Sequence, residues 1–384
     1  MRNIVTGLDI GTAAIRVVVA EWKRGSQTPQ VLAMVKKNAR GIRRGYILHS
    51  EEAAECISEA IKDAEKATKI RIKQAFIGLS GITLSSRIID GSTAVTRGDM
   101  EIGDLDIERA LDAAQALLPD ASNNEVIHRF PISFKLDSKK IAGRPEGLKG
   151  HKLEVRAMFI TYSTQHLKDL TQTLEAAGLR VSLEDYVASP LAAAFPLLSK
   201  VQKTAGVVSA NIGSQTTSIS VFEEGIPVSM QVFPLGSTDI TNDIALGFKI
   251  TLEEAEQVKR GESTHGGPKK KLDEIIEARL LDIFQYIETH LKKISRNGLL
   301  PAGIVLSGGG SSVPNIENLA RDYFKLPART ADNSIASVSK NQVKDSAWAV
   351  AYGLTYFGSD LAPESGTSTK LATSLLKYLR ELLP

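Results

Sequence analysis

The chain is poor in cysteine, in net charge and in long apolar runs, and each scarcity excludes a class of protein. Cys56 is the only cysteine, so neither an internal disulfide nor a cysteine-rich metal site can form within one chain, and its helical surroundings predict a core residue. The 47 basic and 44 acidic residues leave a net charge of only +3, and no run of Lys and Arg alternates with aromatic residues, which gives nucleic acid little support as a partner. No stretch of eighteen apolar residues occurs, and no apolar block of a signal peptide follows Met1, so we expect a cytoplasmic protein.

The most informative stretch is residues 4–20, where two β-rich apolar runs flank a short turn of glycine, threonine and alanine. Gly11 lets the backbone approach a ligand closely, and the amides of such a turn can converge on an anion. Arg16 can reach back to that anion as a fixed cation, and Asp9 is placed to hold a hard cation through water. The stretch therefore favours a phosphate with magnesium, although an ordinary hairpin would use the same turn residues.

The same pattern recurs in residues 205–222, where Asn211 takes the place of the carboxylate before another Ile-Gly turn. A third turn contains Gly308, Gly309 and Gly310, which suit backbone packed against a flat or bulky ligand. Two matched hairpins about two hundred residues apart, followed by a triple-glycine turn, predict a duplicated scaffold that closes on a nucleotide. The length of 384 residues, with 42% hydrophobic content, is ample for at least two domains.

These turns resemble the nucleotide motifs of the actin-like ATPases, the superfamily of actin, the heat-shock chaperone ATPases and the sugar kinases. Residues 9–12 resemble its first phosphate motif, 211–216 its second, and 306–311 its adenosine motif. The order of segments, residues 253–259 and above all the last sixteen residues narrow the resemblance to the FtsA family of bacterial division proteins. This resemblance extends over nearly the whole chain.

The resemblance implies an α/β, actin-like two-domain ATPase fold, with an α+β insert called domain 1C in place of actin subdomain 1B and a C-terminal amphipathic helix. The implied parts are residues 1–80, 162–200 and 338–358 for domain 1A, 81–161 for the inserted domain 1C, 201–234 and 301–337 for domain 2A, 235–300 for domain 2B, 359–369 for a flexible linker and 370–384 for the amphipathic helix. The small residues of 188–194 predict a helix that passes close to another backbone, with 345–357 as its partner, either as a hinge or as tight core packing.

Local patterns predict the elements around these motifs. An N-capped helix is expected from Ser50 to Lys69, two short strands at 85–89 and 92–95, and a further strand at 181–183. Residues 266–271 are expected to form a solvated, lysine-rich loop before a long amphipathic helix.

The resemblance also implies that ATP and Mg²⁺ bind between the two halves, with Asp9 holding the metal. Glu256 and Lys259 resemble the pair that contacts ribose and adenine, although a plain helical charge pair would show the same i, i+3 spacing. The implied cofactor-binding residues are Asp9, Gly11, Thr12, Ala13, Arg16, Asn211, Gly213, Ser214, Gln215, Thr216, Gly236, Glu256, Lys259, Gly308, Gly309 and Gly310.

Three departures from the family pattern bear on activity. Many relatives carry Asp where Asn211 stands, and glycines are common where this chain has Ser214 and Gln215. The chaperone-like pattern has an acidic residue where this chain has Ser189. Because an amide lacks the charge that holds magnesium or orients water, we expect nucleotide binding with at most slow ATPase activity. The chain is expected to be primarily a scaffold rather than an enzyme.

The end of the chain has the pattern of an amphipathic helix that follows a flexible linker. At about 100° per residue, its leucines fall on one side and most of its charges on the other, in a segment too short to span a bilayer. A helix that docks on its own domain would show the same wheel, but the linker and the basic residues favour an anionic membrane surface. The implied membrane residues are Leu371, Leu375, Leu376, Lys377, Leu379, Arg380, Leu382 and Leu383.

The function implied by the resemblance is that of a polymerising membrane tether for FtsZ filaments, located at the cytoplasmic face of the membrane at the division septum. Its implied partners are the C-terminal tail of FtsZ, contacted by Arg279, other copies of the chain, an anionic membrane surface and, through domain 1C, other division proteins. Nucleic acid is not expected. The alternatives are a PilM-like protein of type IV pilus assembly, which lacks the terminal helix, and a sugar kinase or phosphatase, which would need a catalytic acid that we do not find.

Overall fold

The computed structural model describes residues 3–23, 25–26, 28–119, 122–263, 267–331 and 345–358. The linker expected at 359–369 and the amphipathic helix expected at 370–384 lie outside the described residues. Within the described ranges, no helix is both long and apolar enough to cross a bilayer.

The first half of the molecule is built on a five-stranded sheet with the order β11-β6-β1-β2-β3. Its strands are β1 (Asn3–Ile10), β2 (Ala14–Trp22), β3 (Gln30–Asn38), β6 (Phe76–Leu79) and β11 (Tyr186–Ala188). Apolar residues fill both faces of the central strands, so Leu8, Val17 and Val18 are completely buried. This pattern fits a sheet covered by helices on both sides.

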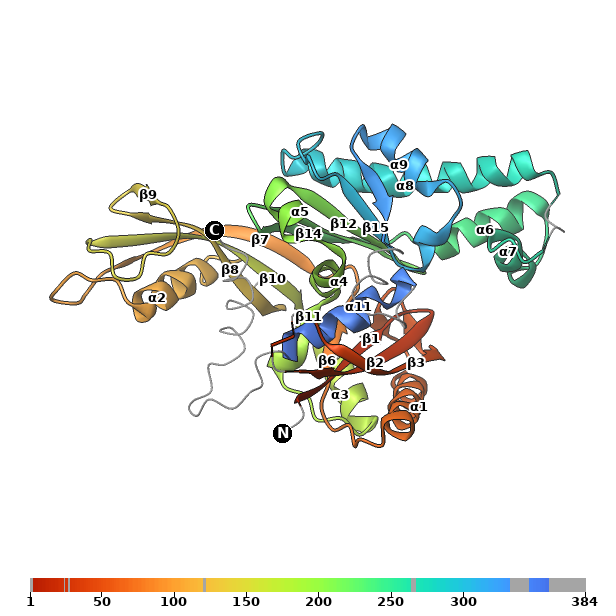
Figure 1. The fold of residues 1–384 in the computed structure, drawn as a ribbon, viewed down its shortest axis with the longest axis horizontal. Coiled ribbons are helices and arrows are strands. Elements are labelled where there is room, and N and C mark those ends of the chain that lie inside the picture. The colour runs from red at the N-terminus through yellow and green to blue at the C-terminus, as the bar shows by residue number, and fades with distance from the viewer. Residues whose placement is uncertain are drawn as a thin grey trace.

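Four helices cover this sheet: α1 (Ser50–Thr68), α3 (Thr164–Ala176), α4 (Ser189–Leu197) and α11 (Ala349–Leu354). Helices α1 and α3 lie below the sheet in Figure 1, whereas α4 and α11 lie above it, between the two halves. Cys56 of α1 is buried in this core, as expected. A short hairpin, β4 (Ile42–Arg43) and β5 (Tyr46–Ile47), precedes α1.

The second half contributes the strands β12 (Val207–Ile212), β13 (Thr217–Glu223), β14 (Ile226–Phe233), β15 (Ile304–Ser307) and β16 (Ala328–Thr330). Its helices are α5 (Lys200–Ala205), α6 (Ser237–Phe248), α7 (Leu252–Lys259), α8 (Lys269–Lys293) and α9 (Ile316–Phe324). Helices α6 and α7 lie to the right of the sheet in Figure 1, and the long helix α8 runs from there across the top of the sheet. Together these elements enclose a second apolar core.

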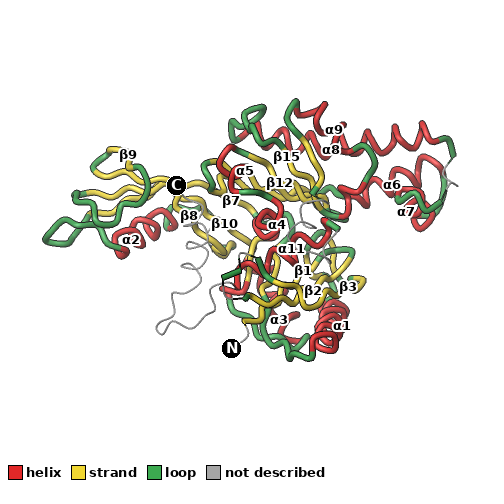
Figure 2. Tube along the Cα trace, viewed as in Figure 1, coloured by secondary structure: helices red, strands yellow, loops and turns green. Residues whose placement is uncertain are grey.

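The insert extends from the opposite side of the molecule as a small α+β unit. It consists of β7 (Ser85–Ala94), α2 (Asp104–Gln115), β8 (Asn124–Leu136), β9 (Lys139–Ile141) and β10 (Lys152–Ser163). Its strands continue the second sheet, giving the order β16-β15-β12-β13-β14-β7-β10-β8-β9 (Figure 2). The junction is narrow: Ser85 pairs with Gln231, and Ser86 Oγ exchanges hydrogen bonds with the backbone of Met230.

Helices α4 and α11 approach each other closely, as their small residues predict. A Cβ atom added at Gly353 would lie 1.9 Å from the carbonyl oxygen of Ala192, so only glycine fits there. Every residue of α4 is buried. The close backbone approach is therefore confirmed, while a hinge at this contact stays a prediction.

The first two corrections concern strands. The two strands expected at 85–89 and 92–95 are a single strand, β7, because Gly91 marks a close approach of α2 rather than a break: a Cβ there would lie 2.5 Å from the backbone of Ala110. The strand expected at 181–183 is wrong. The Asp185 carboxylate accepts hydrogen bonds from the backbone and hydroxyl of Ser182 and closes a 3₁₀ turn, after which the strand β11 begins.

Two further corrections concern helix starts. Ser50 does not cap α1, because the N-cap is His49 and Ser50 Oγ instead hydrogen-bonds Thr173 Oγ1 of α3. The prediction of a solvated loop at 266–271 is wrong for the three lysines. Pro268 is the N-cap of α8, and the lysines form the first turn of that helix. Lys271 Nζ donates to the carbonyl oxygen of Gly247 near the end of α6, which fixes this turn against its neighbour.

Candidate nucleotide site

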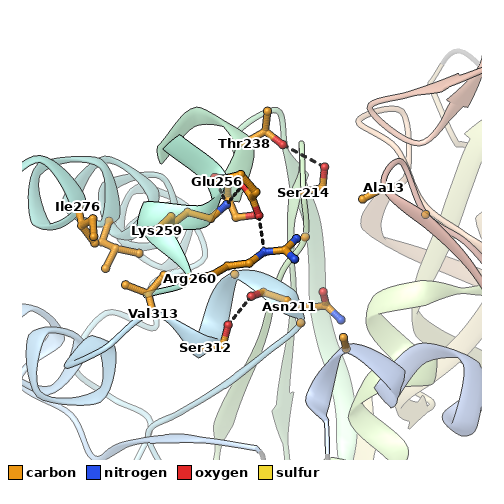
Figure 3. Close-up of a pocket in the computed structure, with 18 of the residues that line it drawn as sticks. Ala13, Asn211, Ser214, Thr238, Glu256, Lys259, Arg260, Ile276, Ser312 and Val313 are labelled. Atoms are coloured by element: carbon orange, nitrogen blue, oxygen red, sulfur yellow. Dashed lines mark hydrogen bonds and ion pairs between the residues drawn. The ribbon is translucent and has the colours of Figure 1, made fainter. Parts of the chain in front are cut away.

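A cleft of about 1250 Å³ lies between the two halves, and all three predicted turns open into it. The β1–β2 turn lies on one side, the β12–β13 turn on the other, and the glycines that follow β15 line it as well. Figure 3 shows this convergence, with Ala13 facing Ser214 and Asn211 across the cleft. The two hairpins and the triple-glycine turn, which are far apart in the sequence, therefore form one site.

The first turn places one carboxylate and one guanidinium at the end of the cleft. Asp9 and Arg16 are register partners on β1 and β2, and Arg16 Nη1 lies 3.8 Å from Asp9 Oδ2. Burial raises the pKa of Asp9 to about 6, and the positive charge of Arg16 opposes that rise. Arg16 Nε is buried without a hydrogen-bond partner in the described structure. Because its ion pair with Arg16 is this long, the buried carboxylate of Asp9 is available to a cation. The unsatisfied Nε–H group of Arg16 is available to an anion.

The second turn repeats the geometry of the first without its charges. Gly11 N donates to Ala14 O at 3.1 Å, and in the equivalent place Gly213 N donates to Thr216 O at 2.8 Å. By register, Asn211 stands where Asp9 stands, and its partner Ser218 takes the place of Arg16. The second turn can therefore donate amides to an anion but supplies no carboxylate to a metal.

The three glycines of the third turn have different roles. A Cβ at Gly308 would lie 2.5 Å from Ile212 O, and one at Gly310 would lie 2.4 Å from Ile212 Cγ2, so both glycines let this turn pack on β12. A Cβ at Gly309 would meet no atom within 4 Å. Gly309 therefore leaves open space in the cleft, which a flat ligand could occupy.

Glu256 and Lys259 form a fixed network on the wall of the cleft rather than a surface pair (Figure 3). Lys259 Nζ donates to Glu256 Oε2 at 2.6 Å, to Thr241 Oγ1 at 2.8 Å and to Ser237 O at 3.2 Å. Burial raises the pKa of Glu256, but the hydrogen bonds from Lys259 and Thr241 outweigh it, so the net pKa lies below the usual value. The result is an ionised carboxylate held by α6 and α7, suited to accept hydrogen bonds from the hydroxyl groups of a sugar.

Two predicted cofactor residues do not line the cleft. The backbone of Gly236 supports the second turn from behind, since a Cβ there would lie 2.5 Å from Ser214 O. The side chain of Gln215 points to a different partner, and its Oε1 accepts a hydrogen bond from Arg44 N at 3.0 Å. The other fourteen implied cofactor residues all lie along the cleft.

Arg279 lies on α8 and is engaged within the chain. Its Nε and Nη2 donate to the two carboxylate oxygens of Asp243, at 2.6 and 3.0 Å, and its Nη1 lies 3.1 Å from Asp282 Oδ2. The hydrogen bond to Asp243 raises the pKa of Arg279 above the usual value of an arginine. The bidentate pair ties α8 to α6, a structural role that its sequence position did not reveal.

Several lining residues were missed by sequence reasoning. Lys36 and Asn38 reach the cleft from β3, and Arg260 reaches it beyond the end of α7, where Arg260 Nε lies 2.9 Å from Glu256 Oε1. Lys36 and Asn38 follow no glycine turn, so only their pairing with β2 brings them to the site. Ser189, by contrast, was singled out from the sequence: it lines the cleft, and its Oγ is buried and has no hydrogen-bond partner in the described structure.

The residues near the phosphate turns fit a magnesium ion that is shared with a ligand. Within the part of the chain that the structure describes, no group of three or more His, Cys, Asp or Glu side chains could hold a metal alone. Mg²⁺ is usually bound by one or two carboxylates together with phosphates and waters. Asp9 supplies one such carboxylate at the first turn.

Family comparisons cover the insert and the second half. The family model described as cell division protein FtsA matches residues 208–353, and that of the SHS2 domain inserted in FtsA matches residues 81–161. The cell division protein FtsA of Streptococcus pneumoniae is 30% identical over 83% of this chain and 73% of its own length. That of Pseudomonas aeruginosa is 28% identical over 93% of this chain and 89% of its own length.

Solved structures with low sequence identity share the fold. A chain of the PilM–PilN type IV pilus biogenesis complex matches 93% of this chain and 98% of its own length, with a TM-score of 0.68 at 20% identity. The ethanolamine utilization protein EutJ from Carboxydothermus hydrogenoformans has a TM-score of 0.55 at 16% identity, with 92% of this chain and 89% of its own length covered. MreB5 of Spiroplasma citri bound to ADP has a TM-score of 0.50 at 14% identity, with 87% and 93% covered. The expected actin-like fold with an inserted α+β domain is thereby confirmed.

Proposed function

This chain belongs to the FtsA family of cell division proteins, and we propose that it is an ATP-binding scaffold that polymerises and tethers FtsZ filaments to the inner face of the membrane at the division septum. The observation that carries the nucleotide-binding part of the proposal is the convergence of the three turns on one cleft, and the division role rests on membership of the family. No enzyme chemistry beyond slow ATP hydrolysis is needed for this role.

In the proposed complex, the amides of the two hairpin turns hold the phosphates, and Arg16 contributes a fixed positive charge. Asp9 holds Mg²⁺, whose role when bound is to neutralise charge on the phosphates. The base lies in the open space over Gly309, and Glu256 accepts hydrogen bonds from the ribose. A protein of the same fold has been solved with ADP, which supports a nucleotide as the ligand.

Hydrolysis is proposed to be slow because neither Asn211 of the second turn nor Ser189 of α4 supplies an acidic group beside the phosphates. Asn211 and Ser189, both at the cleft, are neutral where a carboxylate could activate water. Their polar atoms can orient a water molecule but cannot take its proton at neutral pH.

Attachment to the membrane is assigned by sequence to residues 370–384, outside the described ranges, and the FtsZ contact to α8 around Arg279. Arg279→Glu alone is a poor test of that contact, because it also breaks the pair with Asp243. Asp243→Ala is the matched control, since it breaks the same pair but keeps the guanidinium, which still has Asp282 as a partner. Loss of FtsZ co-pelleting with Arg279→Glu but not with Asp243→Ala would support direct contact, whereas equal loss would assign Arg279 a structural role only.

The decisive test of the whole proposal is electron microscopy of the full chain on anionic liposomes, with and without ATP and magnesium. Filaments that coat the lipid in the presence of ATP are expected. A chain that binds ATP but neither polymerises nor adheres to lipid would instead favour the PilM-like alternative, with which this chain shares its fold.

A further inference from the structure

The hairpin β4–β5 makes a two-residue turn whose two amides both reach the nucleotide turns. Arg44 and Gly45 form the turn, with φ of 51° and 82°, as in the tight turns that favour hairpins. Arg44 N donates to Gln215 Oε1 at 3.0 Å, and Gly45 N donates to Thr12 Oγ1 at 3.2 Å. Thr12 belongs to the first phosphate-type turn and Gln215 to the second, so one small turn contacts both.

The bond between Gln215 and Arg44 crosses from one half of the molecule to the other. Other hydrogen bonds join the halves elsewhere: Ser220 Oγ donates to Pro190 O of α4. At the third turn, Ser346 Oγ lies within hydrogen-bonding distance of Gly308 O and Ser311 Oγ. Because Gly45 N is bonded to Thr12 of the first phosphate turn, separation of the two phosphate turns lengthens the distance from Arg44 N to Gln215 Oε1 as long as that bond to Thr12 holds. The side chain of Gln215 therefore bridges the two halves instead of lining the cleft.

The same turn also contacts residues 81–83, which lead into β7 and are called here the root of the insert. A Cβ at Gly45 would lie 2.7 Å from Gly81 N, and one at Gly81 would lie 2.7 Å from the ring of Tyr46. The backbone of Gly81 is therefore packed directly against both Gly45 and the ring of Tyr46. Tyr46 OH accepts a hydrogen bond from Thr83 N at 2.6 Å. Thr83 lies just before β7, the first strand of the insert.

We propose that Gln215 is a positioning residue that clasps the cleft shut over a bound nucleotide through the Arg44–Gly45 turn, and that this turn transmits closure to the root of the insert through Tyr46. The inference rests on the proposed binding of ATP. With the nucleotide bound, the two phosphate turns bind the same ligand and lie close together. The hydrogen bond from Arg44 N to Gln215 Oε1, which forms only when the turns are close, then adds to the stability of the closed cleft. The Arg44–Gly45 turn then has a fixed position, and so does Tyr46, whose hydroxyl accepts the hydrogen bond from Thr83 N.

The first test measures the association and dissociation rates of a fluorescent ATP analogue, mant-ATP with magnesium, by stopped flow. Gln215→Met keeps the length of the side chain but removes the acceptor, so dissociation should become roughly twofold to tenfold faster with association unchanged. Arg44→Gly is the matched control: it keeps the N–H donor and tolerates the positive φ, so its rates should match the wild type.

The second test measures hydrogen exchange in the peptide that contains Thr83, with and without ATP. Exchange should slow on ATP binding in the wild type, whereas Tyr46→Phe, which removes the acceptor for Thr83 N, should bind mant-ATP normally but lose this response. A wild type that binds no mant-ATP would overturn the proposed function and this inference together. Normal binding with an unchanged dissociation rate in Gln215→Met would overturn the clasp alone, and a full ATP response in Tyr46→Phe would overturn the transmission.

Discussion

Gly309→Asp is the sharpest test of where the nucleotide lies. The position accepts a side chain without strain, because its φ is not in the left-handed region and a Cβ there meets no atom within 4 Å. Its neighbours do not have this freedom, since a Cβ at Gly310 would collide with Ile212. A substitution at Gly309 therefore perturbs the ligand rather than the fold.

The expected loss of affinity follows from the charge that the substitution introduces. If a phosphate lies about 5 Å from the new carboxylate, two unit charges at an effective dielectric constant of about 20 repel by about 3 kcal/mol, which lowers affinity about a hundredfold or more. If adenine lies there instead, the carboxylate loses its hydration against the base, and the cost is again of several kcal/mol. Both arrangements predict that ATP binding is lost at micromolar protein concentrations.

Isothermal titration calorimetry with ATP and magnesium measures this loss, and a thermal melt checks that the fold is intact. Gly309→Asn is the matched control, because it adds the same volume without the charge and so separates repulsion from obstruction. An unchanged ATP affinity in Gly309→Asp, with a wild-type melting temperature, would refute our placement of the nucleotide in this cleft.

Three further predictions concern the buried lysine of α5, hydrolysis and the tail. Lys203 lies over the rings of Phe195 and Phe222, and burial lowers its pKa from 10.5 to about 8. Keeping this lysine charged therefore costs about 3 kcal/mol at pH 7, of which its contact with the rings returns about 1 kcal/mol, so Lys203→Met should stabilise the fold by about 2 kcal/mol. The gain should fade between pH 8 and 10.5, as urea midpoints at both ends would reveal. Because Asn211 is neutral, ATP turnover should stay below about one per second, and a faster phosphate release would contradict that reasoning. Six leucines of the tail gain about 9 kcal/mol gross at the membrane, against about 1 kcal/mol for each of about a dozen ordered residues, a cost that the helix hydrogen bonds partly recover. One tail therefore binds weakly, and attachment depends on the many tails of one filament. Leu376→Glu with Leu379→Glu should abolish liposome flotation, whereas persistent flotation would favour a helix that docks on its own domain.

The two hairpins of the nucleotide site could be predicted from the sequence, because they depend only on neighbouring residues. The two hairpins follow from apolar runs around small-residue turns, and the structure places both turns at the cleft. The strand expected at 181–183 failed for an equally local reason, because the capping interaction between Ser182 and Asp185 competes with extended backbone. Reading that pair as a turn signal would have placed the strand at Tyr186.

Long-range pairings were beyond sequence reasoning. Gln215 was assigned to the cofactor from its place in the second turn, but its partner is the backbone of Arg44, 171 residues away. The continuation of the second sheet into the insert likewise depends on Ser86 meeting Met230, two residues 144 apart. Neither contact leaves a periodic or compositional trace in the sequence, so only the folded chain reveals it.

The duplicated architecture is most informative where its two copies differ. The backbone of the second turn repeats that of the first, as the equivalent bonds from Gly11 and Gly213 show, so both turns can donate amides to the same anion. The charged pair of the first copy, Asp9 and Arg16, becomes a neutral pair in the second. A symmetric site with two carboxylates would bind metal from both sides and could activate water from either. In this chain the first copy offers a carboxylate to a metal and the second copy offers only neutral hydrogen-bonding groups, an arrangement that favours holding a nucleotide over hydrolysing it.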